Sequence, residues 1–317
     1  MSEFDLIRRH FTRSAPNALL GVGDDAALMK VSCGMALAVS TDMLVCGTHF
    51  FADADPISLG HKTLAVNLSD LAAMGAVPRW ATLAISMPEA DNAWLAAFSS
   101  GFFALADRYG VDLVGGDTTR GPLNLCVTIF GEVDAQNALR RSGAKIGDEI
   151  WVSGKIGDAA LALAHMQGRI ALTAGEFAAS SPSLHRPEPR VGLGRALCGV
   201  ASGAIDLSDG LLSDLGHMLD SSAVGAEVEL SALPVSDALR GRLDSDIGRQ
   251  CALAGGDDYE LCFTAPACNR GQVLDISARL GLQLTAIGRI LPGSGCSVRD
   301  ASGNSIDQKS GGYDHFR

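Results

Sequence analysis

The chain has 317 residues, a formal net charge of −11 and 47% hydrophobic residues. Its acidity argues against a general nucleic-acid-binding surface, which needs basic patches, and no apolar run reaches the roughly 18 residues of a membrane-spanning helix. The first residues, MSEFDLIRRHF, mix charged with apolar side chains and predict a short amphipathic helix rather than a signal peptide. We therefore expect a cytoplasmic protein, long enough for two domains, without nucleic-acid or membrane partners.

The predicted strands and helices alternate along the chain, which favours an α/β fold. In the first half they are, in order, a strand at 35–42, a helix at 56–75, a strand at 79–87, a helix at 91–110, and strands at 111–117 and 123–133. A polar, glycine-containing stretch at 138–148 follows these elements. We place the boundary between two domains within it, so that the domains span 1–140 and 141–317.

The second half continues the alternation. Its predicted elements are a strand at 149–154, a helix at 158–168, a loop that includes SPSLHRPEPR, a helix near 191–202, a strand entering a helix over 203–219, a helix near 269–280 and a strand at 284–290. SGKIGD at 153–158 loosely resembles a phosphate loop but lacks the G-x-x-x-x-G-K-[ST] spacing, so we expect a plain strand–turn–helix. We expect the basic HRPEPR at 185–190 to be a surface loop.

The eight cysteines form no C-x-x-C pair. Most of them lie in apolar segments such as LNLCVTIF. This distribution predicts buried, reduced thiols rather than zinc ligands or disulfides.

Aspartates gather where apolar elements meet turns, next to Gly, Ser or Thr. They are Asp24 and Asp25 in GVGDDAAL, Asp42 in STD, Asp117 in VGGDTTRG, Asp206 and Asp209 in IDLSDG, and Asp257 and Asp258 in AGGDDYE. Turn formation and helix capping explain any single motif but explain the whole set poorly. Oxygen ligands without clustered His or Cys favour Mg²⁺, which typically joins carboxylates to substrate phosphates. The neighbouring glycines would let backbone N–H groups approach a phosphate.

Asp70 is a further acid in an unusual place. It lies in AVNLSDLAAMGAVP, near the end of the predicted 56–75 helix, which Gly75 and Pro78 would terminate. The helix dipole and the apolar neighbours both disfavour an anion at this point. A bound cation would remove that conflict.

These motifs follow one another in the order seen in the bacterial thiamine-monophosphate kinases, which the chain resembles over nearly its whole length. They are GVGDDAAL, STDMLVCGTHF, NLSDLAAMGA, GGDTTRG, RSGAKIGD, IDLSDGL, AGGDDYELCF and GGYDHF. Some are shared with aminoimidazole ribonucleotide synthetases and selenophosphate synthetases. The combination of NLSDLAAMGA and GGDTTRG with the final GGYDHF is more specific to the kinases.

The resemblance implies an α/β (α+β) fold of the aminoimidazole ribonucleotide synthetase type. In it, the N-terminal domain binds ATP and Mg²⁺ and pairs its sheet with its copy across a homodimer, while the C-terminal α/β domain contributes to ATP and substrate binding. The implied reaction is direct transfer of the γ-phosphoryl group of ATP to thiamine monophosphate, with several Mg²⁺ ions and without a covalent intermediate. Phosphoryl transfer of this kind needs positioning and charge neutralisation rather than an essential general base.

The resemblance also implies roles for individual residues. The metal set is Asp25, Ser40, Thr41, Asp42, Asp70, Asp117 and Asp206, with Asp209 as a further ligand and with Ser40 and Thr41 acting partly through backbone oxygens. The implied ATP contacts are Tyr109, Gly116, Asp117, Arg141 and Ser208. The implied thiamine contacts are His49, Asp257 and Tyr313. The family commonly has Glu where this chain has Asp257, so the charge is kept but the side chain is shorter.

Three alternative functions remain open at this point. One is a synthetase of the same superfamily that activates an amide or selenide, although selenophosphate synthetases place a reactive residue near the N-terminus and the first cysteine here is Cys33, in an apolar segment. Another is a metal-dependent phosphohydrolase, which would release inorganic phosphate without an acceptor. The last is a nucleotide-binding scaffold without catalytic activity.

Overall fold

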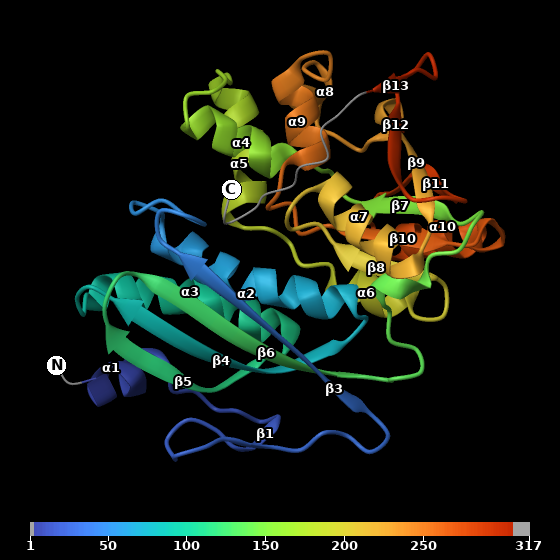
Figure 1. Cartoon of the computed structure of the whole chain (residues 1–317). Coiled ribbons are helices and arrows are strands. Elements are labelled where there is room, and N and C mark those ends of the chain that lie inside the picture. Colours follow the sequence, from blue (N-terminus) through green and yellow to red (C-terminus); the bar gives the residue numbers. More distant parts are fainter. Residues whose placement is uncertain (1–2, 307–317) are drawn as a thin grey trace. The chain divides into compact units, whose positions relative to one another are not determined.

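The structure, a computed structural model, describes residues 3–306 and divides the chain into two compact units (Figure 1). Among these residues, the N-terminal unit comprises 3–71 and 76–136, and the C-terminal unit comprises 72–75 and 137–306. Each unit has its own sheet. Among the described residues, no helix combines the length and apolar character needed to cross a membrane.

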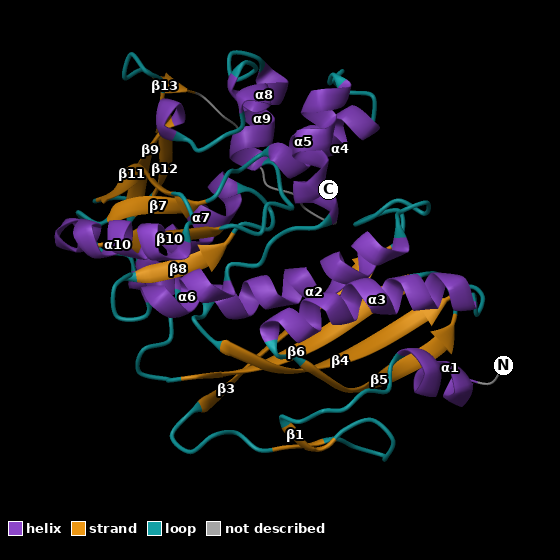
Figure 2. Ribbon diagram, turned by 180° about the vertical axis from the view of Figure 1, so that it is seen from behind, coloured by secondary structure: helices purple, strands orange, loops and turns teal. Residues whose placement is uncertain are grey.

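The N-terminal unit is a four-stranded sheet with the order β3-β6-β4-β5, in which only the β4–β5 pair is parallel. Figure 2 shows α2 and α3 lying along one face of this sheet. Its elements are α1 (Glu3–His10), β1 (Ala18–Leu20), β2 (Leu28–Met29), β3 (Ala36–Val45), α2 (Pro56–Ala73), β4 (Val77–Met87), α3 (Asn92–Tyr109), β5 (Asp112–Arg120) and β6 (Asn124–Val133).

The two long helices of this unit begin at aspartate caps and meet at glycines. The Asp55 carboxylate accepts a hydrogen bond from the Ser58 N–H, ahead of Pro56 at the first helical position of α2. Asp91 caps α3 in the same way. A Cβ atom on Gly60 would overlap the Phe98 carbonyl, and one on Gly101 would overlap the Ile57 carbonyl. The helices can therefore approach this closely only because neither position carries a side chain.

The two faces of the N-terminal sheet differ in burial. Leu125, Val127 and Ile129 of β6 are fully buried on the helix-covered face. On edge strand β3 the alternation leaves an apolar row on the other face, with Leu37, Val39 and Met43 exposed at 44%, 53% and 55%. One face thus forms the core and the other carries accessible apolar side chains.

The C-terminal unit is built on a seven-stranded sheet with the order β13-β12-β9-β11-β7-β10-β8, in which only the β12–β9 pair is parallel. Its strands are β7 (Glu149–Ser153), β8 (Gly203–Asp206), β9 (Gly225–Glu229), β10 (Leu261–Ala265), β11 (Leu284–Leu291), β12 (Gly295–Arg299) and β13 (Ser305–Ile306). Its helices are α4 (Asp158–Met166), α5 (Ala174–His185), α6 (Val191–Leu197), α7 (Leu211–Ser222), α8 (Asp237–Arg240), α9 (Asp246–Ala254) and α10 (Arg270–Leu280), with short 3₁₀ turns at Arg141–Gly143, Leu230–Ala232 and Ala267–Asn269.

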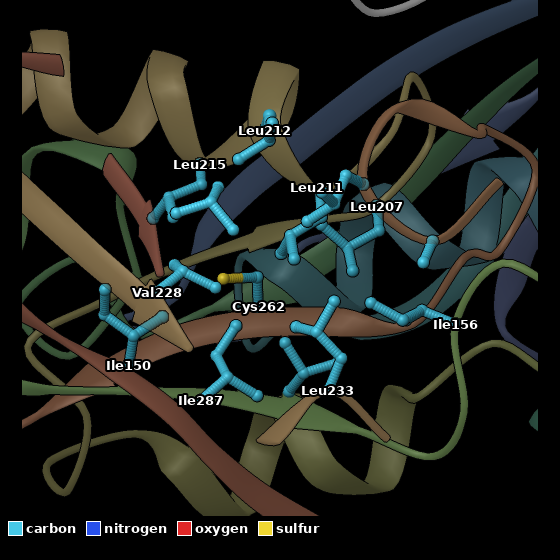
Figure 3. Close-up of a cluster of buried hydrophobic side chains, with 14 of the residues drawn as sticks. Ile150, Ile156, Leu207, Leu211, Leu212, Leu215, Val228, Leu233, Cys262 and Ile287 are labelled. Atoms are coloured by element: carbon cyan, nitrogen blue, oxygen red, sulfur yellow. The ribbon is translucent and has the colours of Figure 1, made fainter. Parts of the chain in front are cut away.

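A large hydrophobic cluster stabilises the C-terminal unit (Figure 3). Leu211 and Leu215 project from α7 toward Val228 and Cys262 of the sheet, and all four are almost completely buried. Burial of a leucine of this kind stabilises a fold by about 1.5–3 kcal/mol. The apolar side of α7 therefore packs the helix against the sheet and fixes the position of the turn between β8 and α7.

Most predicted elements are confirmed, including the amphipathic first helix and the strand–turn–helix at SGKIGD. The predicted loop before residue 191 is wrong, because α5 occupies much of it. Thr173 and Glu176 form a capping box that starts this helix, and the T-x-x-E spacing was its signal. The expectation of buried cysteines is wrong in part: all eight are free, but only Cys251 and Cys262 are buried, and Cys33 and Cys268 are exposed.

Candidate active site

In the N-terminal unit, β3 and α2 bring three of the predicted metal-set residues into one neighbourhood. Strand alternation puts Ser40 and Asp42 on the same face of β3. Ser40 Oγ donates a hydrogen bond to Asp70 Oδ2 on α2, and the Asp42 backbone N–H donates to Asn67 Oδ1 at 3.2 Å. Asp42 and Asp70 are only partly buried.

Thr41 and His49 belong to the same segment but are oriented differently. Thr41 is exposed on the opposite face of β3, where its hydroxyl lies 2.9 Å from that of Thr128. Its side chain is therefore directed away from Asp70, which leaves the backbone oxygen as the atom suited to the predicted role. His49 follows the end of β3, and its Nδ1 accepts the Val45 N–H at 3.0 Å. This bond fixes the neutral ring tautomer that carries its proton on Nε2.

Asp117 and Gly116 lie on β5, at the other edge of the sheet. The register runs from Asp42 through Val127 and Leu83 to Gly116, so three interstrand spacings separate the two edges, about 14 Å. Asp42 and Asp117 therefore do not contact the same small ion directly across the sheet. A Cβ atom on Gly116 would overlap the Leu83 carbonyl, which explains the glycine before this exposed acid.

Two further predicted residues of the N-terminal unit stand apart from these groups. Asp25 is exposed in the turn between β1 and β2, and its N–H donates to the Asp24 carboxylate at 2.9 Å. Tyr109 is the last residue of α3, with the Arg108 guanidinium 5.2 Å from its ring centre. Tyr109 and Gly116 are both predicted ATP contacts, but Tyr109 precedes β5 and Gly116 lies within that strand. Their backbones are therefore not adjacent.

In the C-terminal unit, two predicted loops are joined by backbone hydrogen bonds. The Asp257 N–H donates to the Ser208 carbonyl, the Tyr259 N–H to the Leu207 carbonyl, and the Leu207 N–H to the Glu260 carbonyl, at 2.8–2.9 Å. Residues 206–210 and 255–260 therefore form one structural element. The structure brings together Asp206, Ser208 and Asp209 of the first loop with Asp257 of the second.

The second loop holds a conformation that is unusual for its residues. Asp257 and Tyr259 have positive φ values of 71° and 50°. Few residues other than Gly, Asn and Asp adopt this region without strain, so Tyr259 is the unusual residue of the two. The Tyr259 hydroxyl donates to Asp257 Oδ1 at 3.2 Å, which orients the acid predicted to contact the substrate.

Buried ionic and hydrogen-bond contacts hold residues 255–260 in place. Glu260 forms an ion pair with Arg190 and accepts a hydrogen bond from Ser153 Oγ, and the Asp258 carboxylate accepts the Gly157 N–H on both oxygens at 2.9 Å. Burial raises the pKa of Glu260, although Arg190 and Ser153 oppose this. Burial, reinforced by neighbouring acids, raises the pKa of Asp258 well above its usual value, against the opposing effect of the Gly157 N–H. Arg190 is largely buried, so the expectation of a surface loop at HRPEPR is wrong for this residue.

Asp214 holds the first loop. Its Oδ2 accepts the backbone N–H groups of Ser208, Asp209 and Gly210 at 3.0, 3.0 and 3.1 Å. Burial, followed by the charge of Asp209, raises the pKa of Asp214 to about 7, and the three N–H donors act in the opposite direction. This acid is only 3% exposed.

Arg141 lies beside the start of β8, since the neighbouring Arg140 carbonyl accepts the Ala204 N–H. Ser208 follows the other end of that strand, so the structure does not bring the two backbones together. Tyr313 lies outside the described residues.

The donor atoms suit magnesium. The predicted set offers carboxylate, hydroxyl and backbone oxygens, which are the hard ligands that Mg²⁺ prefers. No three His, Cys, Asp or Glu side chains within 3–306 are grouped closely enough to hold a metal by themselves.

Sequence reasoning missed Asn67, Asp214 and the Arg190–Glu260 pair. Asn67 lies three residues before Asp70, which is the spacing that places two side chains on one helix face. Asp214 lies in the first turn of α7, and an acid at such a position is a sequence signal for an interaction with the N–H groups at the start of the helix. Arg190 and Glu260 are 70 residues apart, so no local pattern could have paired them.

Comparison with known proteins adds to this geometry. Residues 23–133 match the family described as AIR synthase related protein, N-terminal domain, and residues 145–301 match the corresponding C-terminal domain. Thiamine-monophosphate kinase of Salmonella typhimurium is 50% identical over 321 residues, which cover 99% of this chain and 98% of the relative.

Two solved structures are similar over almost the whole chain. Thiamine-monophosphate kinase from Stenotrophomonas maltophilia K279a has a TM-score of 0.88 and 49% identity, with 96% of this chain and 98% of that one covered. AaThiL complexed with AMPPCP and TMP has a TM-score of 0.78 and 29% identity, with 99% and 96% covered.

Proposed function

The chain belongs to the thiamine-monophosphate kinases, and we propose that it transfers the γ-phosphoryl group of ATP in line and directly to the phosphate of thiamine monophosphate, with Mg²⁺ as cofactor. The kinase activity itself follows from family membership, since relatives of this name match end to end. A related structure contains AMPPCP together with TMP, which supports the same pair of substrates here. The single observation that carries the proposal is the 50% identity over 99% of the chain.

The chemistry of the site supports direct transfer. A phosphate oxygen of the substrate can attack without deprotonation by the protein, so the residues need only bind and orient two anions. Bound Mg²⁺ would supply the charge neutralisation that an acidic protein cannot.

We assign the protein's own contributions as follows. Asp42 and Asp70, with Ser40 and the Thr41 carbonyl, hold metal in the N-terminal unit, together with Asp25 and Asp117. Asp206 and Asp209 do so in the C-terminal unit. ATP contacts Tyr109, Gly116, Asp117, Arg141 and Ser208, and thiamine monophosphate contacts His49, Asp257 and Tyr313. His49 would use its Nε2–H as a donor, because Nδ1 already accepts the Val45 N–H.

We further propose that the chain forms a homodimer through the open face of the N-terminal sheet. The exposed Leu37, Val39 and Met43 support this, since a row of apolar side chains on an uncovered sheet face favours association.

Stereochemistry tests the direct, in-line step. ATP whose γ-thiophosphate is made chiral with oxygen isotopes should yield the thiamine diphosphate analogue that carries this thiophosphate with inverted configuration at phosphorus, because a single displacement inverts it. Retention would indicate two displacements through a phosphorylated enzyme and would overturn the proposed mechanism.

The Asp42→Asn and Asp117→Asn variants should lower turnover by orders of magnitude while remaining folded, and retained activity in either would remove that residue from the metal set.

A further inference from the structure

The turn between β8 and α7 contains an anion-binding arrangement of the backbone that is already occupied. The N–H groups of Ser208, Asp209 and Gly210 converge on one oxygen of Asp214. Consecutive N–H groups ahead of a helix are the arrangement with which proteins often bind phosphate. Here a carboxylate from the first turns of α7 takes the position that a phosphate would need.

The turn has little room to adopt another shape. Gly210 has φ 115° and ψ 152°, and a Cβ atom on it would crowd the Ala254 backbone. On the other side, the Ser208 carbonyl is held by the Asp257 N–H, and a Cβ atom on Gly256 would overlap that carbonyl. The Asp214 contacts are therefore the ones that fix the N–H side of the turn.

We propose that Asp214 is a positioning residue: it fixes residues 208–210 so that the Ser208 and Asp209 side chains, rather than the backbone N–H groups, meet Mg²⁺·ATP. This inference rests on the proposed function, which assigns those two side chains to ATP and metal. In a phosphate loop, the backbone N–H groups bind the phosphate of the ligand. Here the Asp214 carboxylate accepts those N–H groups instead, so the nucleotide would not bind to them.

Hydrogen exchange of the protein without substrates measures the positioning directly. In Asp214→Ala, the amides of Ser208, Asp209 and Gly210 should exchange at least tenfold faster, whereas amides of β10 should be unchanged. Asp214→Asn keeps one oxygen acceptor and the same shape, so it should give an intermediate effect. Asp220→Asn, an exposed acid in the last turn of the same helix, is the matched control.

Steady-state kinetics measures the consequence. Asp214→Ala should raise KM for ATP and the Mg²⁺ concentration for half-maximal rate at least tenfold, with less than a threefold change in KM for thiamine monophosphate. Partial rescue by Asp214→Asn should accompany this split. Equal rises in both KM values, or unchanged exchange of the three amides, would overturn the proposal; if Asp214→Ala does not fold, Asp214→Asn carries the same comparison.

Asp209→Asn separates this inference from the function on which it rests. If Asp209→Asn raises the Mg²⁺ requirement while both Asp214 variants behave like the parent, the positioning role is wrong and the site assignment stands. If Asp209→Asn and Ser208→Ala both leave KM for ATP and the Mg²⁺ requirement unchanged, the assignment of this turn fails and the positioning proposal fails with it.

Discussion

Asp70 lies in the last turn of α2, where the helix dipole disfavours an anion, and Ser40 donates a hydrogen bond to its carboxylate. That hydrogen bond contributes about 1 kcal/mol, and one to a charged acceptor somewhat more. A cation bound between Asp70 and Asp42 would also offset the unfavourable helix dipole. We therefore expect this acid to serve metal binding rather than stability.

We expect Asp70→Ala to weaken Mg²⁺-dependent binding of a non-hydrolysable ATP analogue at least tenfold, measured by titration calorimetry with and without Mg²⁺. Without metal, its free energy of unfolding should change by less than about 1 kcal/mol, because the lost hydrogen bond is offset by relief of the dipole. Asp70→Asn, which keeps an acceptor for Ser40, is the control. A clearly less stable metal-free Asp70→Ala would make Asp70 a structural acid.

Asp258 allows a pH test of the buried acids behind the substrate loop. Its pKa in the folded protein is raised by burial and by the neighbouring acids, so the folded state binds this proton more tightly than the unfolded state. The contribution of Asp258 to stability therefore increases as the pH falls through the folded-state pKa and is lost as the pH rises through it.

We expect Asp258→Asn to be more stable relative to the parent at pH 9 than at pH 5, since the amide never has to ionise. Urea unfolding at several pH values measures this, with the exposed Asp220→Asn as control. A stability difference that does not change between pH 5 and pH 9 would show that Asp258 does not titrate in this range as proposed.

At the scale of elements, the contact between α2 and α3 depends on Gly60 and Gly101. Alanine is favoured over glycine in a helix by about 1 kcal/mol, so a substitution without packing consequences would stabilise the protein. We expect the opposite for Gly101→Ala, a loss of more than about 2 kcal/mol, because the new Cβ atom overlaps the Ile57 carbonyl and overpacking destabilises. Ser100→Ala, at an exposed position of the same helix, is the control in denaturant unfolding. A more stable Gly101→Ala would contradict the described helix contact.

Hydrophobic periodicity and caps were sufficient to predict most elements, because the helices 56–75 and 91–110 carry long apolar patterns with clear ends. The helix α5 was missed because SPSLHRPEPR contains prolines that are typical of loops, although Pro182 is tolerated inside it. The strand order could not be predicted, since the partners of β7, for example, are β10 and β11, more than 100 residues away.

The sequence predicts candidate site residues mainly where acids follow strand ends next to glycine, as with Asp206 and Asp209. The residues that hold those acids were not predicted. Asp257, Glu260 and Arg190 interact through tertiary contacts that only the folded chain creates. Local patterns therefore indicated the chemistry of the site, while its support depends on packing.

At the scale of the whole molecule, the open face of the N-terminal sheet carries the prediction of a homodimer. The Val39→Glu substitution would place a charge in the middle of the exposed row of Leu37, Val39 and Met43. We expect Val39→Glu to shift the protein from dimer to monomer in light scattering coupled to size exclusion. Leu274→Glu, at a similarly exposed apolar residue of α10, should leave the mass unchanged. A monomeric parent, or a dimeric Val39→Glu variant, would contradict this use of the face.

As a thiamine-monophosphate kinase, the chain phosphorylates thiamine monophosphate. Incubation with ATP, Mg²⁺ and thiamine monophosphate, followed by chromatography, tests it most directly. We predict thiamine diphosphate and ADP in equal amounts, both dependent on Mg²⁺ and on the acceptor. The absence of thiamine diphosphate above a control without enzyme, or ADP and inorganic phosphate formed without the acceptor, would contradict the claim.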